Sequence, residues 1–428
     1  MDTEHYKNKS RLTENNFIRD RKLGFKSIFS LVLCLIRKST QLEIDNFLDT
    51  FVENRFNILT YSKQAFSKAR QNITEQAFTL LNDDIISGYY SDNDFKKYKG
   101  WRLLGCDGSR IEIPNTEDTQ SYFGYAENQH NRKTARALAL GIYDLENEIM
   151  ISSTLGHYND SERELAETCI EKMLEYDNSK IKNLIVFDRG YPSFKLIMYL
   201  NSKNIDFVMR TNINLFKEYE NIKTEDEIVE FEIKGKRKWD IKSKHGLDVG
   251  EDCTLRLRVL KFVLKTGEYE MLITNVLEKE NLSFNEIVEI YGKRWGIETS
   301  FDELKNKLEI ENFSGKKPII IKQDFYATIL IYNIAALFKN EAQEELNEKK
   351  GENQKYDYKI NKNVLFSKVR NKLIKLILEP NKKKKEIMFD NILNEIKRNV
   401  VPIRKNRNNP RDKSENRNKY SQNNRRCL

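Results

Sequence analysis

The residues best suited to chemistry lie in one stretch of this chain, residues 291–305. Placed on an α-helix at about 100° per residue, four polar side chains of this stretch share one arc, and apolar side chains fill the arc beside it. The four are Tyr291, Arg294, Glu298 and Lys305. A carboxylate between two cations can bind a metal ion while the cations hold an anion such as phosphate. The simpler interpretation is an amphipathic helix with an i,i+4 ion pair between Arg294 and Glu298.

Two aspartates directly follow apolar runs elsewhere in the chain. Asp107 follows the run 103–106, and Asp188 follows the run 184–187. Short, continuously apolar runs of this kind are typical of buried strands. We therefore expect each aspartate at the end of a strand, where a sheet can present it to a ligand.

The spacing Y-(2)-R-(3)-E-(6)-K resembles the signature of bacterial insertion-sequence transposases of the DDE class, in the "insertion sequence four" family. In that family the Glu of the signature is the third catalytic carboxylate, and two aspartates at strand ends precede it. The resemblance implies catalytic, metal-binding roles for three carboxylates, Asp107, Asp188 and Glu298. It implies DNA-binding roles for Tyr291, Arg294 and Lys305, and all six positions match the family pattern.

The resemblance also implies a reaction, a cofactor and partners. The enzyme would cleave transposon ends and transfer the freed 3′-hydroxyl strand into target DNA by two-metal phosphoryl transfer. Carboxylate oxygens suit Mg²⁺, for which Mn²⁺ can substitute. The implied partners are double-stranded DNA, as the terminal inverted repeats of the transposon and as the target, and a second copy of the chain in a homodimeric synaptic complex.

Three alternatives stay open at this point. A ribonuclease-H-like, metal-dependent nuclease would cut DNA without strand transfer, and a catalytically inactive relative would only bind it. A basic RNA-binding protein has less support, because the chain contains no aromatic motif of the kind that RNA-recognition sheets use.

Charge is concentrated at one end of the 428-residue chain. The net charge is +9, and residues 401–428 carry nine Lys/Arg against two acidic residues, which leaves only about +2 for the rest. Such an arm is expected to meet a polyanion, and a solvated tail is the alternative. The five cysteines are scattered without a C-x-x-C pair, so the sequence predicts neither a disulfide framework nor a zinc site.

Membrane association is not expected from the apolar runs. The run 27–36 is half the length of a membrane helix, and the run 325–338 is interrupted by Tyr332 and Asn333. Together with the resemblance, this predicts a bacterial protein that is cytoplasmic and associated with the nucleoid.

The predicted elements between residues 101 and 210 follow the order of an α/β fold, the ribonuclease-H-like mixed sheet. Strands are expected at 101–107, 136–143, 149–155, 183–187 and 206–210, and helices at 161–176 and 193–201. In that fold the first and fourth strands lie side by side, so Asp107 and Asp188 would converge.

The chain is expected to form several domains. They are a helical N-terminal DNA-binding domain at 1–100, a catalytic domain at 101–345 with an inserted β subdomain at 211–282, a C-terminal helical region at 346–400, and a basic tail at 401–428.

Two features outside the catalytic motifs carry their own hypotheses. The helix pair 63–71 and 75–86 resembles a helix-turn-helix that would bring Gln64, Lys68 and Arg70 near DNA, and two helices of a bundle are the alternative. Trp239 lies among cationic residues and is a candidate for stacking on an unpaired base, with core packing or simple surface exposure as the alternatives.

Overall fold

The computed structural model describes residues 3–18, 24–34, 39–51, 61–176, 181–247, 250, 253–263, 267–349 and 356–404. The chain forms two compact units, Asp84–Phe301 and the combination of Met1–Asp83 with Asp302–Leu428. The helices α5 (Gln76–Tyr90) and α11 (Trp295–Asn306) each contain a boundary between these units. Within the described residues, no helix is long and apolar enough to cross a membrane.

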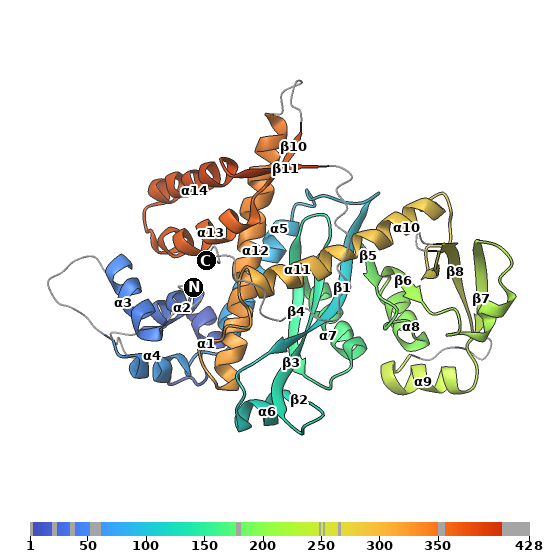
Figure 1. Ribbon diagram of the computed structural model, residues 1–428, viewed down its shortest axis with the longest axis horizontal. Helices are drawn as coiled ribbons and strands as arrows, with labels where there is room; N and C mark the ends of the chain where they lie inside the picture. The colour runs from blue at the N-terminus through green and yellow to red at the C-terminus, as the bar shows by residue number, and fades with distance from the viewer. Residues whose placement is uncertain are drawn as a thin grey trace. The chain divides into compact units, whose positions relative to one another are not determined.

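The unit Asp84–Phe301 is built on a nine-stranded mixed sheet (Figure 1). Its strands are β1 (Trp101–Glu112), β2 (Tyr125–Glu127), β3 (Lys133–Asp144), β4 (Ile149–His157), β5 (Lys182–Phe187), β6 (Asp206–Thr211), β7 (Asp226–Glu232), β8 (Thr254–Val263) and β9 (Tyr269–Thr274). Eight of them follow the order β2-β3-β1-β5-β6-β9-β8-β7, and β4 pairs with β3. The strand β1 is antiparallel to β3 and parallel to β5, which is parallel to β6.

Helices cover both faces of this sheet. The helices of this unit include α6 (Glu117–Phe123), α7 (Glu162–Tyr176), α8 (Phe194–Ser202), α9 (Lys236–His245), α10 (Phe284–Lys293) and the first part of α11, with the 3₁₀ turn η1 (Lys217–Asn221). One face carries α10 and α11, nearly end to end, and the other carries α7 and α8 (Figure 1). Under α10, Ile287 and Ile290 join a buried cluster with Leu103 of β1 and Leu184 and Val186 of β5.

The ribonuclease-H-like fold predicted from the sequence is confirmed. The three strands β1, β3 and β4 precede α7, and then β5, α8 and β6 follow in the predicted order. The first and fourth of these strands, β1 and β5, are direct parallel neighbours. Burial explains why the apolar runs were sufficient to locate them, since five of the six residues of β5 are buried.

The strands expected in an inserted β subdomain form, but they continue the main sheet. The strand β9 pairs with β6 from Val208↔Thr274 to Thr211↔Met271, and β8 and β7 follow outward. Without β9, the edge of β6 would leave its backbone N–H and C=O groups unpaired.

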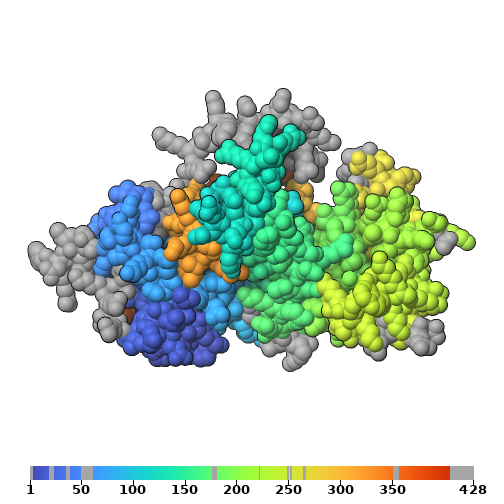
Figure 2. All heavy atoms as spheres, turned by 90° about the horizontal axis from the view of Figure 1, so that it is seen from below, coloured from blue at the N-terminus to red at the C-terminus, as the bar shows by residue number. Residues whose placement is uncertain are grey.

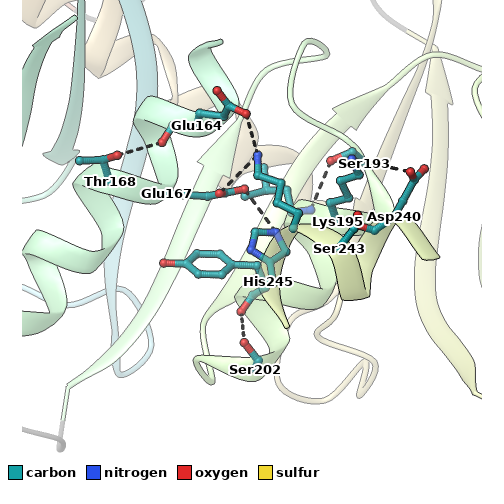
Figure 3. Close-up of polar contacts among 12 residues, drawn as sticks. Glu164, Glu167, Thr168, Ser193, Lys195, Ser202, Asp240, Ser243 and His245 are labelled. Carbon is teal, nitrogen blue, oxygen red and sulfur yellow. Dashed lines mark hydrogen bonds and ion pairs between the residues drawn. The ribbon is translucent and has the colours of Figure 1, made fainter. Parts of the chain in front are cut away.

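The helix α9 was not expected, because its basic sequence contains only one buried apolar residue, Ile241. Figure 3 shows His245, at the end of α9, beside Glu167 of α7, and the Lys244 ammonium lies 3.2 Å from the Glu164 carboxylate. Trp239 is 68% exposed, on a segment that lies at the surface in Figure 2, so it does not pack in the core. Its stacking on a base stays a prediction.

The other unit is mainly helical. Its elements are α1 (Glu4–Ser10), α2 (Phe25–Leu33), α3 (Thr40–Phe51), α4 (Lys63–Arg70), the start of α5, the end of α11, α12 (Pro318–Glu348), β10 (Asp357–Ile360), α13 (Lys362–Leu378), α14 (Lys382–Lys397) and β11 (Val400–Ile403). The C-terminal region 346–400, predicted to be helical, also contains the strand β10, which pairs with β11. Most of the predicted basic tail, residues 405–428, lies outside the described part of the chain.

Arg70 is buried and does not face DNA, in contrast to the helix-turn-helix hypothesis. Its side chain is 2% exposed, and its guanidinium donates to Asp324 and Gln323 of α12 at 2.5 Å each. Gln64 and Lys68, on the same helix, are exposed. A buried guanidinium is tolerated here because several acceptors replace its water.

We expect Arg70→Ala to lower the free energy of unfolding by about 3–5 kcal/mol, because it leaves the buried Asp324 carboxylate without its cation. Urea unfolding followed by circular dichroism measures this loss. The matched control is Lys68→Ala on the same helix, which should change stability by less than about 0.5 kcal/mol. Equal urea midpoints for the two variants would contradict the structural role of Arg70.

Candidate active site

The first two predicted carboxylates lie near the same end of two neighbouring parallel strands, β1 and β5. The last residue pair of β1 with β5 is Cys106↔Phe187, so Asp107 and Asp188 each follow the end of this pairing. Asp107 is not at a strand end, as the sequence suggested, because β1 continues to Glu112 by pairing with β3. Because β5 ends at Phe187, the side chains of Asp107 and Asp188 can project beyond its carboxyl end.

The third carboxylate is brought to this end of the two strands by the junction of α10 and α11. A capping box between Ser283 and Glu286 starts α10, which ends at Lys293. The amide of Arg294 donates to the carbonyl of Tyr291 at 3.1 Å, a tight i,i+3 bond, and α11 begins at the next residue. The predicted single helical run is thus interrupted at Arg294, and Glu298 lies one turn further on.

Arg294 lies between two of the carboxylates. Its guanidinium is 2.5 Å from Glu298 and 3.5 Å from Asp107, and its side chain is only 12% exposed. The i,i+4 ion pair of the simpler interpretation therefore exists, but the same guanidinium also reaches across to β1. One cation is thus shared between a carboxylate from the helix and a carboxylate from the sheet.

Asp188 is held by different partners. The Tyr291 hydroxyl donates to its carboxylate at 3.2 Å, and Arg210 of β6 lies 4.0 Å away. Arg210 is itself paired with Glu270 of β9. Arg210 was not among the predicted site residues, although its place at the end of the strand parallel to β5 could have indicated it.

Four of the other five predicted residues thus lie around Arg294, and Lys305 has another partner. Lys305 lies in the last turn of α11, and its ammonium is 3.6 Å from Glu311. Beside Asp188, a cavity of about 230 Å³ is lined by Arg189, Arg210 and Lys261 among others. It supplies positive charge next to the carboxylates.

Burial and charge shift two protonation equilibria in the site. Burial raises the pKa of Asp107 to about 6, against the lowering effects of the Gly108 amide and Arg294, and with smaller raising effects from Glu162 and Glu298. Burial, followed by the Asp188 carboxylate, raises the pKa of Tyr291 to about 12. Tyr291 therefore remains a hydrogen-bond donor throughout the neutral range.

The donor set fits a hard divalent cation. Asp107, Asp188 and Glu298 offer only oxygen ligands, which suit Mg²⁺ or Mn²⁺ better than zinc. Within the described residues, no three acidic, His or Cys side chains are arranged as a ready metal cage. The guanidinium between Asp107 and Glu298 already places one positive charge beside these carboxylates.

Comparison with known proteins identifies the family. Residues 102–334, more than half of the chain, match the model of the transposase DDE domain. The chain belongs to the transposase DDE domain family.

A relative in Escherichia coli (strain K12), the transposase InsG for insertion sequence element IS4, is 22% identical to this transposase over 327 residues, which cover 74% of this chain and 70% of the relative. The predicted membership of the "insertion sequence four" family is confirmed. The chain is a DNA transposase, an enzyme that acts on DNA with a divalent metal ion.

A solved structure is similar at a lower level. It is the cryo-EM structure of the piggyBac transposase synaptic complex with hairpin DNA, with a TM-score of 0.44 and 12% identity. The similarity covers 92% of this transposase and 80% of that chain.

We expect Asp107→Asn to raise the melting temperature of the metal-free transposase at pH 7.5. The folded carboxyl has a pKa of about 6, above its unfolded value of about 3.9, so the ionised form costs stability above about pH 6. The gain should correspond to at most about 3 kcal/mol. Thermal unfolding in a chelating buffer should show this gain shrinking as the pH falls toward 4, and a gain independent of pH would contradict the assignment.

Proposed function

We propose that this transposase cleaves transposon ends and transfers the freed 3′-hydroxyl strand into target DNA at the edge formed by Asp107, Asp188 and Glu298. The observation that carries the proposal is that Arg294 bonds carboxylates of two separate elements, β1 and α11, beside a third carboxylate that follows β5. The three carboxylates would hold Mg²⁺, with Mn²⁺ as a substitute. When bound, the metal supplies charge neutralisation for the attacking and leaving oxygens of phosphoryl transfer.

The Arg294 guanidinium has two acceptors in this structure, the carboxylates of Asp107 and Glu298. A phosphate group would be a third suitable acceptor. The planar guanidinium forms parallel hydrogen bonds to carboxylate or phosphate oxygens. With the carboxylates neutralised by another cation, Arg294 can donate to a phosphate near the cleaved end. Tyr291 orients the Asp188 carboxylate by its hydrogen bond of 3.2 Å, which supports a positioning role beside the DNA contact implied by the family.

The surfaces that hold DNA are also proposals. The cavity lined by Arg189, Arg210 and Lys261 is suited to backbone phosphates next to Asp188. Lys305, Gln64 and Lys68 are further candidates, and the exposure of Gln64 and Lys68 supports their part in the N-terminal DNA-binding domain proposed for residues 1–100. The DNA partners would be the terminal inverted repeats and the target.

Assembly and cellular context follow from the same proposal. Two ends must be held together for transposition, so we propose a homodimer in the synaptic complex. A DNA substrate and the basic C-terminal tail support association with the nucleoid. The domain division 101–345, 346–400 and 401–428 also stays a proposal, with Asp84–Phe301 as its catalytic core.

We expect Glu298→Gln to reduce Mg²⁺-dependent cleavage by about 10²-fold or more, because it removes a charge that acts on the reacting phosphate. Cleavage is measured on duplex DNA that carries the inverted repeats flanking the coding sequence of this chain, and binding to that duplex should persist. The matched control is Asp302→Asn, an exposed residue one turn further along α11, which should cleave normally.

The companion variant Arg294→Ala should weaken binding to the cleaved end by about 1–3 kcal/mol. Full cleavage by Glu298→Gln would contradict the proposed function. Cleavage by the unaltered protein without joining to target DNA would instead identify a nuclease, and metal-dependent binding without cleavage an inactive relative.

A further inference from the structure

A fourth carboxylate approaches the same edge from the opposite face of the sheet. Glu162 is the first residue of α7, and its carboxyl group lies directly over Gly108, the residue after Asp107. A Cβ atom added at Gly108 would be 3.2 Å from Cδ of Glu162 and 3.3 Å from its Oε1. The missing side chain of Gly108 therefore leaves the opening through which Glu162 reaches the edge.

The approach of α7 is fixed by its next residue. The Arg163 guanidinium donates to the carbonyl oxygen of Gly190 at 3.0 and 2.8 Å. Gly190 belongs to the turn after Asp188, in which the Tyr191 amide donates to the Asp188 carbonyl at 3.1 Å. The first turn of α7 and the loop that carries Asp188 are thus bonded together, which fixes the position from which Glu162 reaches Gly108.

The Tyr191 hydroxyl is a second, independent observation at this edge. Tyr191 is 1% exposed, packs against Phe187 with 5.2 Å between ring centroids, and has a hydroxyl oxygen without a hydrogen bond of normal geometry in the described structure. Its charged or polar neighbours are Cys106, Glu162 and Asp107. A thiol is a weak acceptor, so a buried phenol is left facing two carboxylates.

The carboxylate of Glu162 also lacks a conventional partner. Within the described residues, it has neither an ion pair nor a hydrogen bond. Nearby Glu164 differs, since Lys244 lies 3.2 Å from its carboxylate. In the first turn of α7, the Glu164 carboxylate is thus paired with Lys244, whereas the Glu162 carboxylate lies over Gly108 without a cation among the described residues.

We propose that Glu162 is a fourth carboxylate ligand of the divalent cation held at the Asp107 edge, and that Tyr191 is a positioning residue whose hydroxyl orients this ligand. The inference rests on the proposed function and adds a ligand from α7. A carboxylate turned toward the cation places an oxygen acceptor before the Tyr191 hydroxyl, which satisfies its buried donor. A side chain at position 108 would place its Cβ 3.2 Å from Cδ of Glu162, so the carboxyl group would have to shift by a few tenths of an ångström.

The test is equilibrium binding of Mn²⁺ to the full-length, DNA-free protein at pH 7.5, followed by the electron paramagnetic resonance signal of the free ion. Glu162→Gln should weaken Mn²⁺ binding by about 10–100-fold. The matched control Glu164→Gln makes the same change in the same turn of α7, beside Lys244, and should bind within about twofold of the unaltered protein. Equal affinities for the two variants would overturn the assignment of Glu162.

Two further variants test the geometry. Gly108→Ala keeps Glu162 but displaces its carboxyl group, so Mn²⁺ binding should weaken in the same direction. Tyr191→Phe removes only the hydroxyl, and we expect several-fold weaker Mn²⁺ binding without a lower melting temperature, because a buried hydroxyl without a partner contributes no stability. A lower melting temperature with unchanged Mn²⁺ affinity would show that the hydroxyl is merely structural.

The Asp107→Asn variant separates this inference from the proposed function. If Asp107→Asn loses Mn²⁺ binding while Glu162→Gln retains it, the fourth ligand is wrong and the three-carboxylate site stands. If both variants and the unaltered protein bind Mn²⁺ alike, or if none binds it, the metal site itself is overturned together with the fourth ligand.

Discussion

The arrangement of the active-site edge depends on the need for a cation among buried carboxylates. Two carboxylates can approach each other away from water only if a positive charge lies between them or one takes up a proton. Arg294 supplies that charge, because it is mostly buried and bonds Glu298 and Asp107 at once. The same contact joins α11 to β1. A guanidinium that has phosphate as an alternative acceptor is well suited to hold this place in a DNA transposase.

The close approach of helices to the sheet depends on small residues at chosen points. A Cβ at Gly105 of β1 would be 3.2 Å from Ile297 of α11, and one at Gly296 would be 2.9 Å from Leu145. These two glycines let α11 lie near enough to β1 for Arg294 to span the gap. On the other face, Gly108 leaves room for Glu162. The geometry of the edge is therefore determined as much by absent side chains as by the carboxylates.

The fold and the family of this protein could be predicted before any tertiary contact was known. Apolar runs are local signals, so the order of strands and helices from β1 to β6 could be predicted without knowledge of any contact. The spacing from Tyr291 to Lys305 is also local, and it was sufficient to indicate a DDE transposase. The i,i+4 pair of Arg294 with Glu298 follows from helix geometry alone.

Contacts between residues far apart in the chain could not be predicted in this way and became known from the folded structure. It showed that Arg294 also bonds Asp107, that β9 extends the sheet beyond β6, and that Arg70 is buried against α12. It also brought Glu162 over Gly108. No periodic pattern records such contacts, because they join residues from about 50 to more than 250 positions apart, and their partners are selected by burial and by the requirement that buried charges be paired. The sequence therefore predicts the candidate carboxylates of this transposase, whereas the contact of Arg294 with Asp107 depends on the tertiary fold.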